Sequence, residues 1–142
     1  MAIKLTKITV DSTVNSPVEK IWKLWTTPAD IIQWNNPTDD WHTLSVETDL
    51  VEGGSFLFRM ESKDGSHGFD FCGKYDKVII NELIEYTLSD GRKAINIFII
   101  GSSETRIIEI FEPEGKTPVD VQKDFCQSVL HNFKKYAEGK IE

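Results

Sequence analysis

The sequence lacks the features that mark several large classes of protein. Its 142 residues include only two cysteines, Cys72 and Cys126, which have neither CxxC nor zinc-finger spacing. A chain of this length folds without cross-links, so we expect two reduced thiols in a cytoplasmic protein. No apolar run is long enough to cross a membrane, and the N-terminal residues contain no continuous apolar stretch typical of a secretion signal. We therefore expect neither membrane insertion nor secretion.

Positive charge is also scarce. Sixteen Lys and Arg stand against 23 Asp and Glu, which gives a formal charge of −7, and no basic run is present. This balance disfavours a nucleic acid as partner, because a phosphate backbone is bound mainly through Lys and Arg. The three histidines, His42, His67 and His131, lie far apart and in no ligand motif, and no phosphate-binding loop is present. We expect no metal and no cofactor.

The most distinctive segment that is present is a predicted β-hairpin over residues 53–75. Residues 55–61 form the outward strand, residues 63–66 the turn and residues 67–75 the return strand. Side chains alternate between the two faces of a strand, so one face of this hairpin is almost wholly aromatic. That face carries Phe56, Phe58, Met60, Phe69, Phe71, Gly73 and Tyr75. A surface with so many rings needs a cover.

The remaining periodicity predicts an α+β protein with one domain over residues 1–142. A first strand at 3–12 is followed by a helix with Ser16 as N-cap, Pro17 at its first position and Glu19 completing a capping box. A break at residues 27–30 precedes one or two further turns at 31–34. The other strands are predicted at 43–49, 76–80 as an extension of the hairpin, 83–89, 93–101 and 105–112.

A long C-terminal helix is predicted to begin with Thr117 as cap and Pro118 at its first position, and to run to Ala137. Its length of roughly 30 Å makes it the only element able to cover a sheet of about seven, mostly antiparallel strands. We expect it to lie along the sheet and to cover the aromatic face with Phe125, Val129 and Phe133.

Several segments, in order, resemble the family named for the activator of heat-shock protein 90 ATPase, within the START-like helix-grip (SRPBCC) superfamily. They are residues 15–22, 25–28, 32–34, 49–56, 64–65, 73–75, 83–87 and 111–114, and Asn132-Phe133 followed by Tyr136. The resemblance implies a curled antiparallel sheet around a long C-terminal helix, with a hydrophobic cavity between them. It does not imply one activity, because similar proteins include lipid or sterol carriers, polyketide cyclases, phytohormone-binding proteins and a co-chaperone domain.

The first functional hypothesis is a binding or carrier protein for a small hydrophobic molecule. The expected cavity walls are Phe56, Phe58, Met60, Phe69, Phe71, Phe98, Phe125, Val129 and Phe133, with Trp25, Trp34 and Trp41 near the entrance. Trp34 and Trp41 fall between helix and sheet, where a ring can close one mouth of the cavity, so they are the preferred gate residues. Packing in the core is the alternative for all the tryptophans.

The second hypothesis is an enzyme of the polyketide cyclase or dehydratase type, which needs inward-facing polar groups. The candidates are His67, Tyr75, Tyr86 and Glu109. Glu109 shares a strand face with Ile107 and Phe111, and in a cavity it would have a raised pKa; we favour a solvent-facing position. Arg59 and Asp70 are expected to face solvent.

The third hypothesis is a co-chaperone type of protein-interaction module with an exposed patch on the convex side of the sheet. The family's eukaryotic co-chaperones carry a separate N-terminal domain for which this chain has no room, so we place this hypothesis after the other two. A pull-down with a purified chaperone, scored by stimulated ATP hydrolysis, separates it from them. Monomer and homodimer both stay open.

Overall fold

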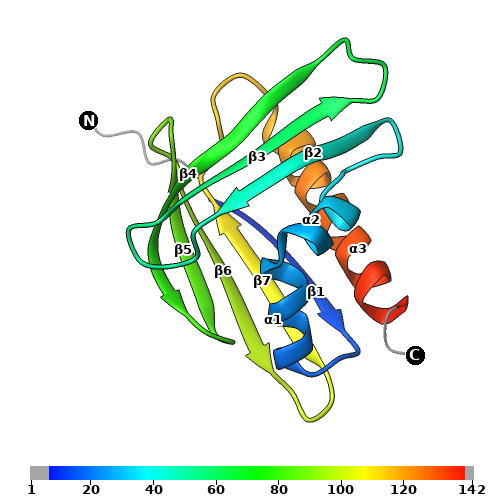
Figure 1. Ribbon diagram of the computed structural model, residues 1–142, viewed down its shortest axis with the longest axis vertical. Helices are drawn as coiled ribbons and strands as arrows, with labels where there is room; N and C mark the ends of the chain where they lie inside the picture. The colour runs from blue at the N-terminus through cyan, green and yellow to red at the C-terminus, as the bar shows by residue number, and fades with distance from the viewer. Residues whose placement is uncertain (1–6, 140–142) are drawn as a thin grey trace.

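The computed structural model describes residues 7–139, in which a curled sheet wraps around a C-terminal helix (Figure 1). The elements are β1 (Ile8–Val14), α1 (Val18–Thr26), α2 (Pro28–Trp34), β2 (Trp41–Thr48), β3 (Ser55–Ser62), β4 (Gly68–Ile79), β5 (Leu83–Leu88), β6 (Lys93–Ile100), β7 (Thr105–Phe111) and α3 (Val119–Gly139). The seven strands are antiparallel in the order β1-β7-β6-β5-β4-β3-β2. The predicted α+β helix-grip arrangement is confirmed. Residues 3–6 of the first predicted strand lie outside the described residues.

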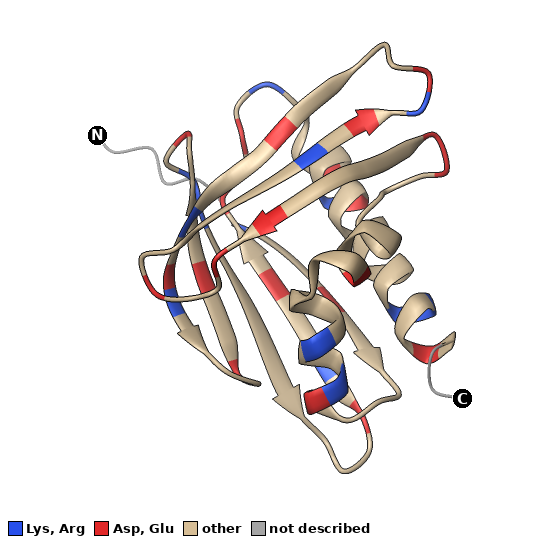
Figure 2. Ribbon diagram, viewed as in Figure 1, with Lys and Arg blue, Asp and Glu red and all other residues tan. Residues whose placement is uncertain are grey.

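The aromatic hairpin forms as predicted from β3 and β4. Phe58 pairs with Phe71 and Met60 with Phe69, so the rings share the concave face of the sheet. On the convex face, Arg59 contacts Glu61 and Asp70, with Nε–Oε2 and Nη1–Oδ1 distances of 2.9 and 3.3 Å. In the view of Figure 2 the basic residues are scattered over separate elements.

The predicted starts of the first and last helices are each one residue early. The carbonyl of Pro17 accepts the first backbone bonds of α1, from the N–H groups of Lys20 and Ile21, so Pro17 itself is the N-cap. Ser16 is held in a turn by its N–H bond to the Val14 carbonyl, and its hydroxyl caps nothing. The prediction of Ser16 as cap, with Glu19 completing a capping box, is therefore wrong.

The same shift occurs at α3, which begins at Val119 because the carbonyl of Pro118 accepts its first bonds. The break between α1 and α2 is also shorter than predicted. Only Thr27 separates the two helices, and α2 begins at Pro28. Within residues 7–139, none of the helices is long and apolar enough to cross a membrane.

The helix α3 does not cover the aromatic face as the sequence predicted. It packs mainly against β1, at one edge of the sheet, where Gln127 Nε2 donates to the Asp11 carbonyl at 3.0 Å and Lys134 Nζ to the Thr13 carbonyl at 2.7 Å. Its fully buried side chains, Leu130, Phe133 and Ala137, all lie in its C-terminal half. The N-terminal half of α3 therefore stands away from the aromatic hairpin instead of covering it.

Gly73 allows β4 to approach β5 closely beneath the aromatic face. A Cβ atom at this position would lie 2.2 Å from the Thr87 carbonyl oxygen and 2.9 Å from the Leu88 Cα, both backbone atoms. We predict that Gly73→Ala lowers the free energy of unfolding by about 2 kcal/mol or more, because the strands must separate. Urea denaturation measures this, with Gly115→Ala as the control, since a Cβ at Gly115 meets nothing within 4 Å. Equal stability of the two variants would contradict the prediction.

Candidate functional site

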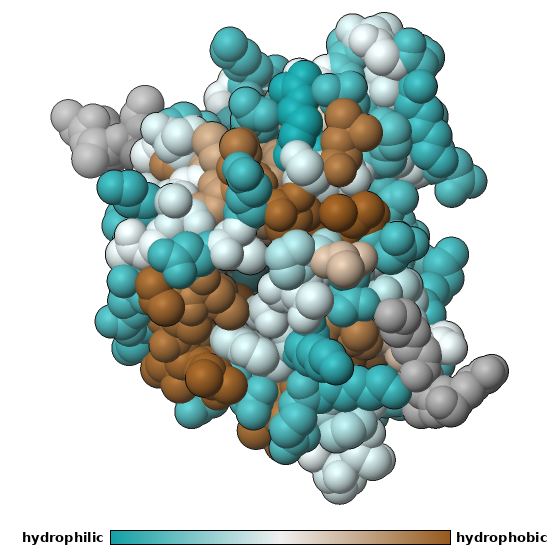
Figure 3. Space-filling model, in the orientation of Figure 1, coloured by the Kyte–Doolittle hydropathy of each residue, from teal (hydrophilic) through white to brown (hydrophobic). Residues whose placement is uncertain are grey.

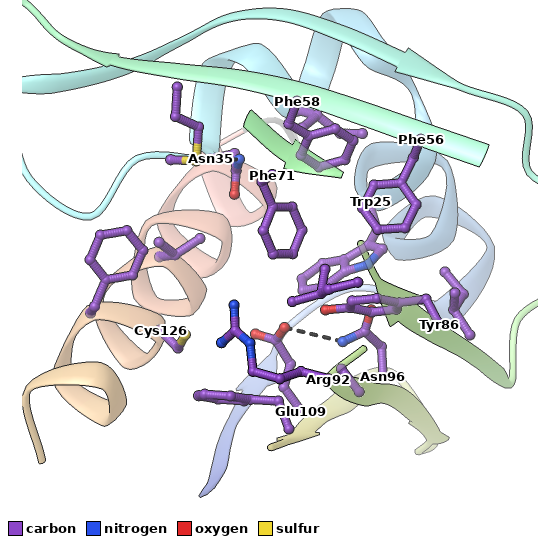
Figure 4. A pocket seen from close by; sticks show the side chains of 18 of the residues that line it. Trp25, Asn35, Phe56, Phe58, Phe71, Tyr86, Arg92, Asn96, Glu109 and Cys126 are labelled. Carbon is purple, nitrogen blue, oxygen red and sulfur yellow. Dashed lines mark hydrogen bonds between the residues drawn. The ribbon is translucent and has the colours of Figure 1, made fainter. Parts of the chain in front are cut away.

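A cavity of about 400 Å³ lies between the concave face of the sheet and α3 (Figure 4). Its predicted wall residues that do line it are Phe56, Phe58, Met60, Phe69, Phe71, Phe125 and Val129, together with Trp25 and Trp34. A volume in this range is typical of small-molecule sites. The cavity exists because the hairpin and the N-terminal half of α3 do not meet.

The rings of the hairpin form one connected wall. The Phe56 ring lies 5.7 Å from Phe58, 5.6 Å from Phe71, 5.0 Å from Tyr75 and 5.4 Å from Tyr86, measured between ring centroids. Contacts at these distances hold aromatic side chains in defined orientations. The wall therefore keeps its shape without being packed from the cavity side.

Trp25 and Trp34 close the end of the cavity near α1 and α2. Their rings stack with centroids 4.8 Å apart, and each also meets Phe133 at 4.9 Å. Trp34 is only 4 % exposed, and its Nε1–H donates to the Leu24 carbonyl at 3.0 Å. This is the position of a core residue and not of a gate.

The structure places three other predicted cavity residues outside the lining. Phe133 is fully buried behind the two stacked tryptophans, and Phe98 packs edge-on against Trp22 and Trp25. Trp41 starts β2 and contacts Phe69, a lining residue, at 5.9 Å without lining the cavity itself. The α3 side chains at the cavity are thus those one to three turns before Phe133.

The mouth lies between the start of β4 and the first turns of α3. Phe69, Val121 and Phe125 line the cavity, yet they are 39 %, 51 % and 36 % exposed. Apolar side chains that face both a cavity and solvent mark an entrance lined by hydrophobic groups. We assign the entrance to these three residues.

A small polar cluster interrupts the apolar lining on the sheet side (Figure 4). Glu109 on β7 and Asn96 on β6 are paired residues, and Asn96 Nδ2 donates to Glu109 Oε2 at 3.1 Å. Tyr86 on β5 and Cys126 on α3 face the same point. The prediction that Glu109 faces solvent is wrong. Glu109 lines the cavity, on the same face of β7 as the fully buried Ile107.

Burial controls the acidity of this cluster. Loss of solvent raises the pKa of Glu109 from 4.5 to about 7, and the bond from Asn96 opposes the rise only in part. Burial, and next the charge of Glu109, raise the pKa of Cys126 to about 12 and that of Tyr86 well above its ordinary value. Glu109 is therefore the one member of this cluster that changes charge near neutral pH.

The other proposed catalytic residues are not together. Tyr75 lines the cavity, and its hydroxyl is 2.6 Å from Thr48 Oγ1; burial raises its pKa while that bond opposes the rise. His67 lies in the exposed turn of the hairpin, with Nδ1 2.9 Å from Ser66 Oγ, and does not reach the cavity. Within residues 7–139, no three His, Cys, Asp or Glu side chains form a group that could hold a metal ion.

The sequence prediction missed Asn96 as a site residue. Alternation along β6 places Asn96 between Ala94 and Phe98 on the inner face, so the signal was present. Cys126 was expected only as a structural thiol; both cysteines are free.

Comparison with known proteins agrees with this architecture. The sequence profile of the family described as Activator of Hsp90 ATPase homolog 1-like protein matches residues 15–139. The chain belongs to this family. No curated protein matches the sequence.

Solved structures extend the likeness over nearly the whole chain. The AHSA1-like protein from Aeromonas hydrophila is 34 % identical, with a TM-score of 0.88 over 94 % of this chain and 93 % of that one. A protein from Cytophaga hutchinsonii is 44 % identical, with a TM-score of 0.82 over 95 % and 94 %. A protein from Nitrosomonas europaea, 16 % identical with a TM-score of 0.81 over 99 % and 98 %, shares the fold.

The buried carboxyl of Glu109 makes stability depend on pH. Between its ordinary pKa of 4.5 and its folded pKa of about 7 the folded protein holds more protons than the unfolded chain, so stability falls as pH rises through this range. Glu109→Gln removes this pH-dependent contribution to stability, because the glutamine side chain does not titrate. We compare the unfolding free energy of Glu109→Gln with that of the parent at each pH. We predict that the variant's advantage is about 1–2 kcal/mol larger at about pH 8 than at about pH 5, a value that allows for water in the cavity.

Urea denaturation at the two pH values measures this difference. Glu85→Gln, on the convex face of β5, is the matched control and should show no such difference. An identical pH dependence for the two variants would show that Glu109 is not buried in the way described.

Proposed function

We propose that the protein binds a small, mainly apolar molecule in the cavity between the sheet and α3. The observation that carries this proposal is the unfilled volume of about 400 Å³ behind a hydrophobic entrance. Protein interiors are usually packed to crystal-like density, and an apolar void without an occupant costs stability. A bound apolar molecule restores the missing contacts.

The lining supports a flat ligand in particular. The wall of Phe56, Phe58 and Phe71 faces the aliphatic side of α3 at Val129. A ring system placed between them can stack on the phenyl groups and contact the helix on its other face. The stacked Trp25 and Trp34 close one end and limit the ligand's length.

Filling the cavity should abolish binding without harming the fold. Ala94 lines the cavity on β6, so Ala94→Phe places a ring in the ligand's volume; we predict at least about a tenfold loss in affinity for the neutral dye N-phenyl-1-naphthylamine. Dye fluorescence measures binding, and thermal unfolding checks the fold. Ala29→Phe, at an exposed position of α2 outside the cavity, is the matched control and should bind as the parent does. Saturable dye binding that is equal in both variants would place the dye elsewhere.

Proton transfer on the bound molecule is a second candidate function, and Glu109 is the observation that favours it. A carboxyl with a pKa of about 7 is matched to acid–base work at neutral pH. Its carboxylate can accept a proton from a carbon next to a ketone. The Asn96 amide and the Tyr86 hydroxyl, beside it, can donate hydrogen bonds to the enolate oxygen that forms.

This second function has a direct test in 2-acetylnaphthalene dissolved in D₂O. If Glu109 removes a methyl proton, exchanges it with D₂O and returns a deuteron to the carbon, the protein should accelerate exchange by about a hundredfold or more over buffer, increasingly as pH rises through about 7. Loss of the methyl proton signal in NMR spectra gives the rate. Glu109→Gln should exchange at the buffer rate, and a parent protein that does the same rules out this function.

The co-chaperone alternative would use a different surface. The exposed apolar residues Ile80, Ile99 and Ile100 lie at the ends of β4 and β6, where Figure 3 shows hydrophobic side chains gathered at the lower left. They are separate from the cavity lining. A chaperone contact at these residues and a ligand in the cavity are therefore compatible with each other.

A further inference from the structure

The carboxylate of Glu109 has fewer hydrogen-bond donors than it can accept. A carboxylate has about four acceptor positions on its two oxygens. Among residues 7–139, the donor to Glu109 is Asn96 Nδ2, which bonds Oε2. The Oε1 atom is left without a donor from the described residues. An acceptor in such a place stays satisfied only through water or through a donor on a ligand.

The groups around Glu109 do not supply that donor. Among residues 7–139, the Tyr86 hydroxyl on β5 makes no hydrogen bond to Glu109. The Cys126 thiol on α3 is buried and weakly acidic, and the residue of β1 that is paired with Glu109 is the apolar Val10. Arg92, in the turn before β6, lines the cavity and has its Nε 2.8 Å from Asp90 Oδ2; within residues 7–139 it makes no hydrogen bond to Glu109. The free lone pairs therefore face the cavity.

We infer that the cavity selects ligands with a flat apolar body and one hydrogen-bond donor, a hydroxyl or amino group, that is directed at Glu109. This inference rests on the proposed binding function and names the class of ligand. The aromatic wall takes the apolar body, and the carboxylate takes the donor in a charge-assisted hydrogen bond. A ligand carboxylate placed beside Glu109 would be repelled by its charge, although Arg92 and Lys93 also line the cavity.

Glu109→Gln should reverse this preference instead of merely weakening it. The Asn96 amide N–H group still needs an acceptor, so it holds the carbonyl oxygen of the new side chain. The NH₂ group of the glutamine then faces the cavity. The site changes from one that accepts a hydrogen bond to one that donates it. Ligands that carry a hydrogen-bond acceptor therefore gain affinity relative to ligands that carry a donor.

Three naphthalene compounds of similar shape test this. The dissociation constants of naphthalene, 2-naphthol and 2-acetylnaphthalene are measured by displacement of N-phenyl-1-naphthylamine. The parent should bind 2-naphthol about tenfold more tightly than naphthalene. In Glu109→Gln that advantage should fall to about threefold or less while 2-acetylnaphthalene gains relative to 2-naphthol. Glu85→Gln, on the convex face, should keep the parent's order.

A measurement without any variant covers the case in which Glu109→Gln does not fold. In the parent, the ratio of naphthalene to 2-naphthol dissociation constants should rise between roughly a unit below and a unit above the Glu109 pKa of about 7, because only the carboxylate is a full acceptor. Burial keeps Tyr86 and Cys126 uncharged over that range.

The outcomes separate the two proposals. If naphthalene itself does not displace the dye, the proposed binding function fails. If naphthalene binds but 2-naphthol has no advantage, or has one that is equal in Glu109→Gln and unchanged with pH, only the donor preference is overturned.

Discussion

The rest of the structure depends on one constraint, which is that a single helix cannot cover the concave face of a seven-stranded sheet. The helix α3 is fixed at the β1 edge, where Gln127 and Lys134 donate to strand carbonyls and the C-terminal half of the helix is buried. The hairpin curls over from the opposite part of the sheet. Its aromatic wall and the N-terminal half of α3 therefore face each other across a space that no side chain fills.

That space explains the unusual placement of a carboxyl group. Glu109 occupies an inward position of β7, where burial works against its charge. A well-packed core would replace it with an apolar residue, because a buried acid with one hydrogen bond costs stability. In a site that takes up a molecule the same group has a use, since its free acceptor positions are available to the ligand.

The sequence predicted the fold and the aromatic face because both rest on strong local patterns. Alternation along β3 and β4 determines which side chains share a face, and the turns limit the register. Sequence patterns did not predict the position of a side chain where packing between distant elements determines it. Nothing local distinguishes Phe125, at the cavity mouth, from Phe133 in the core, because both lie on one apolar stripe of α3. For Glu109 the strand phase was right, and the general preference of carboxylates for water led to the wrong position.

The central claim is that the space between hairpin and helix is open to a small apolar occupant. A crystal structure of the protein under xenon pressure tests it most directly, because xenon enters apolar cavities that side chains leave empty. The account predicts xenon, or an already bound molecule, between Phe71 and Val129, with the rings of the wall in place. A structure in which Phe58, Phe71 and Phe125 turn inward and fill that volume would contradict it.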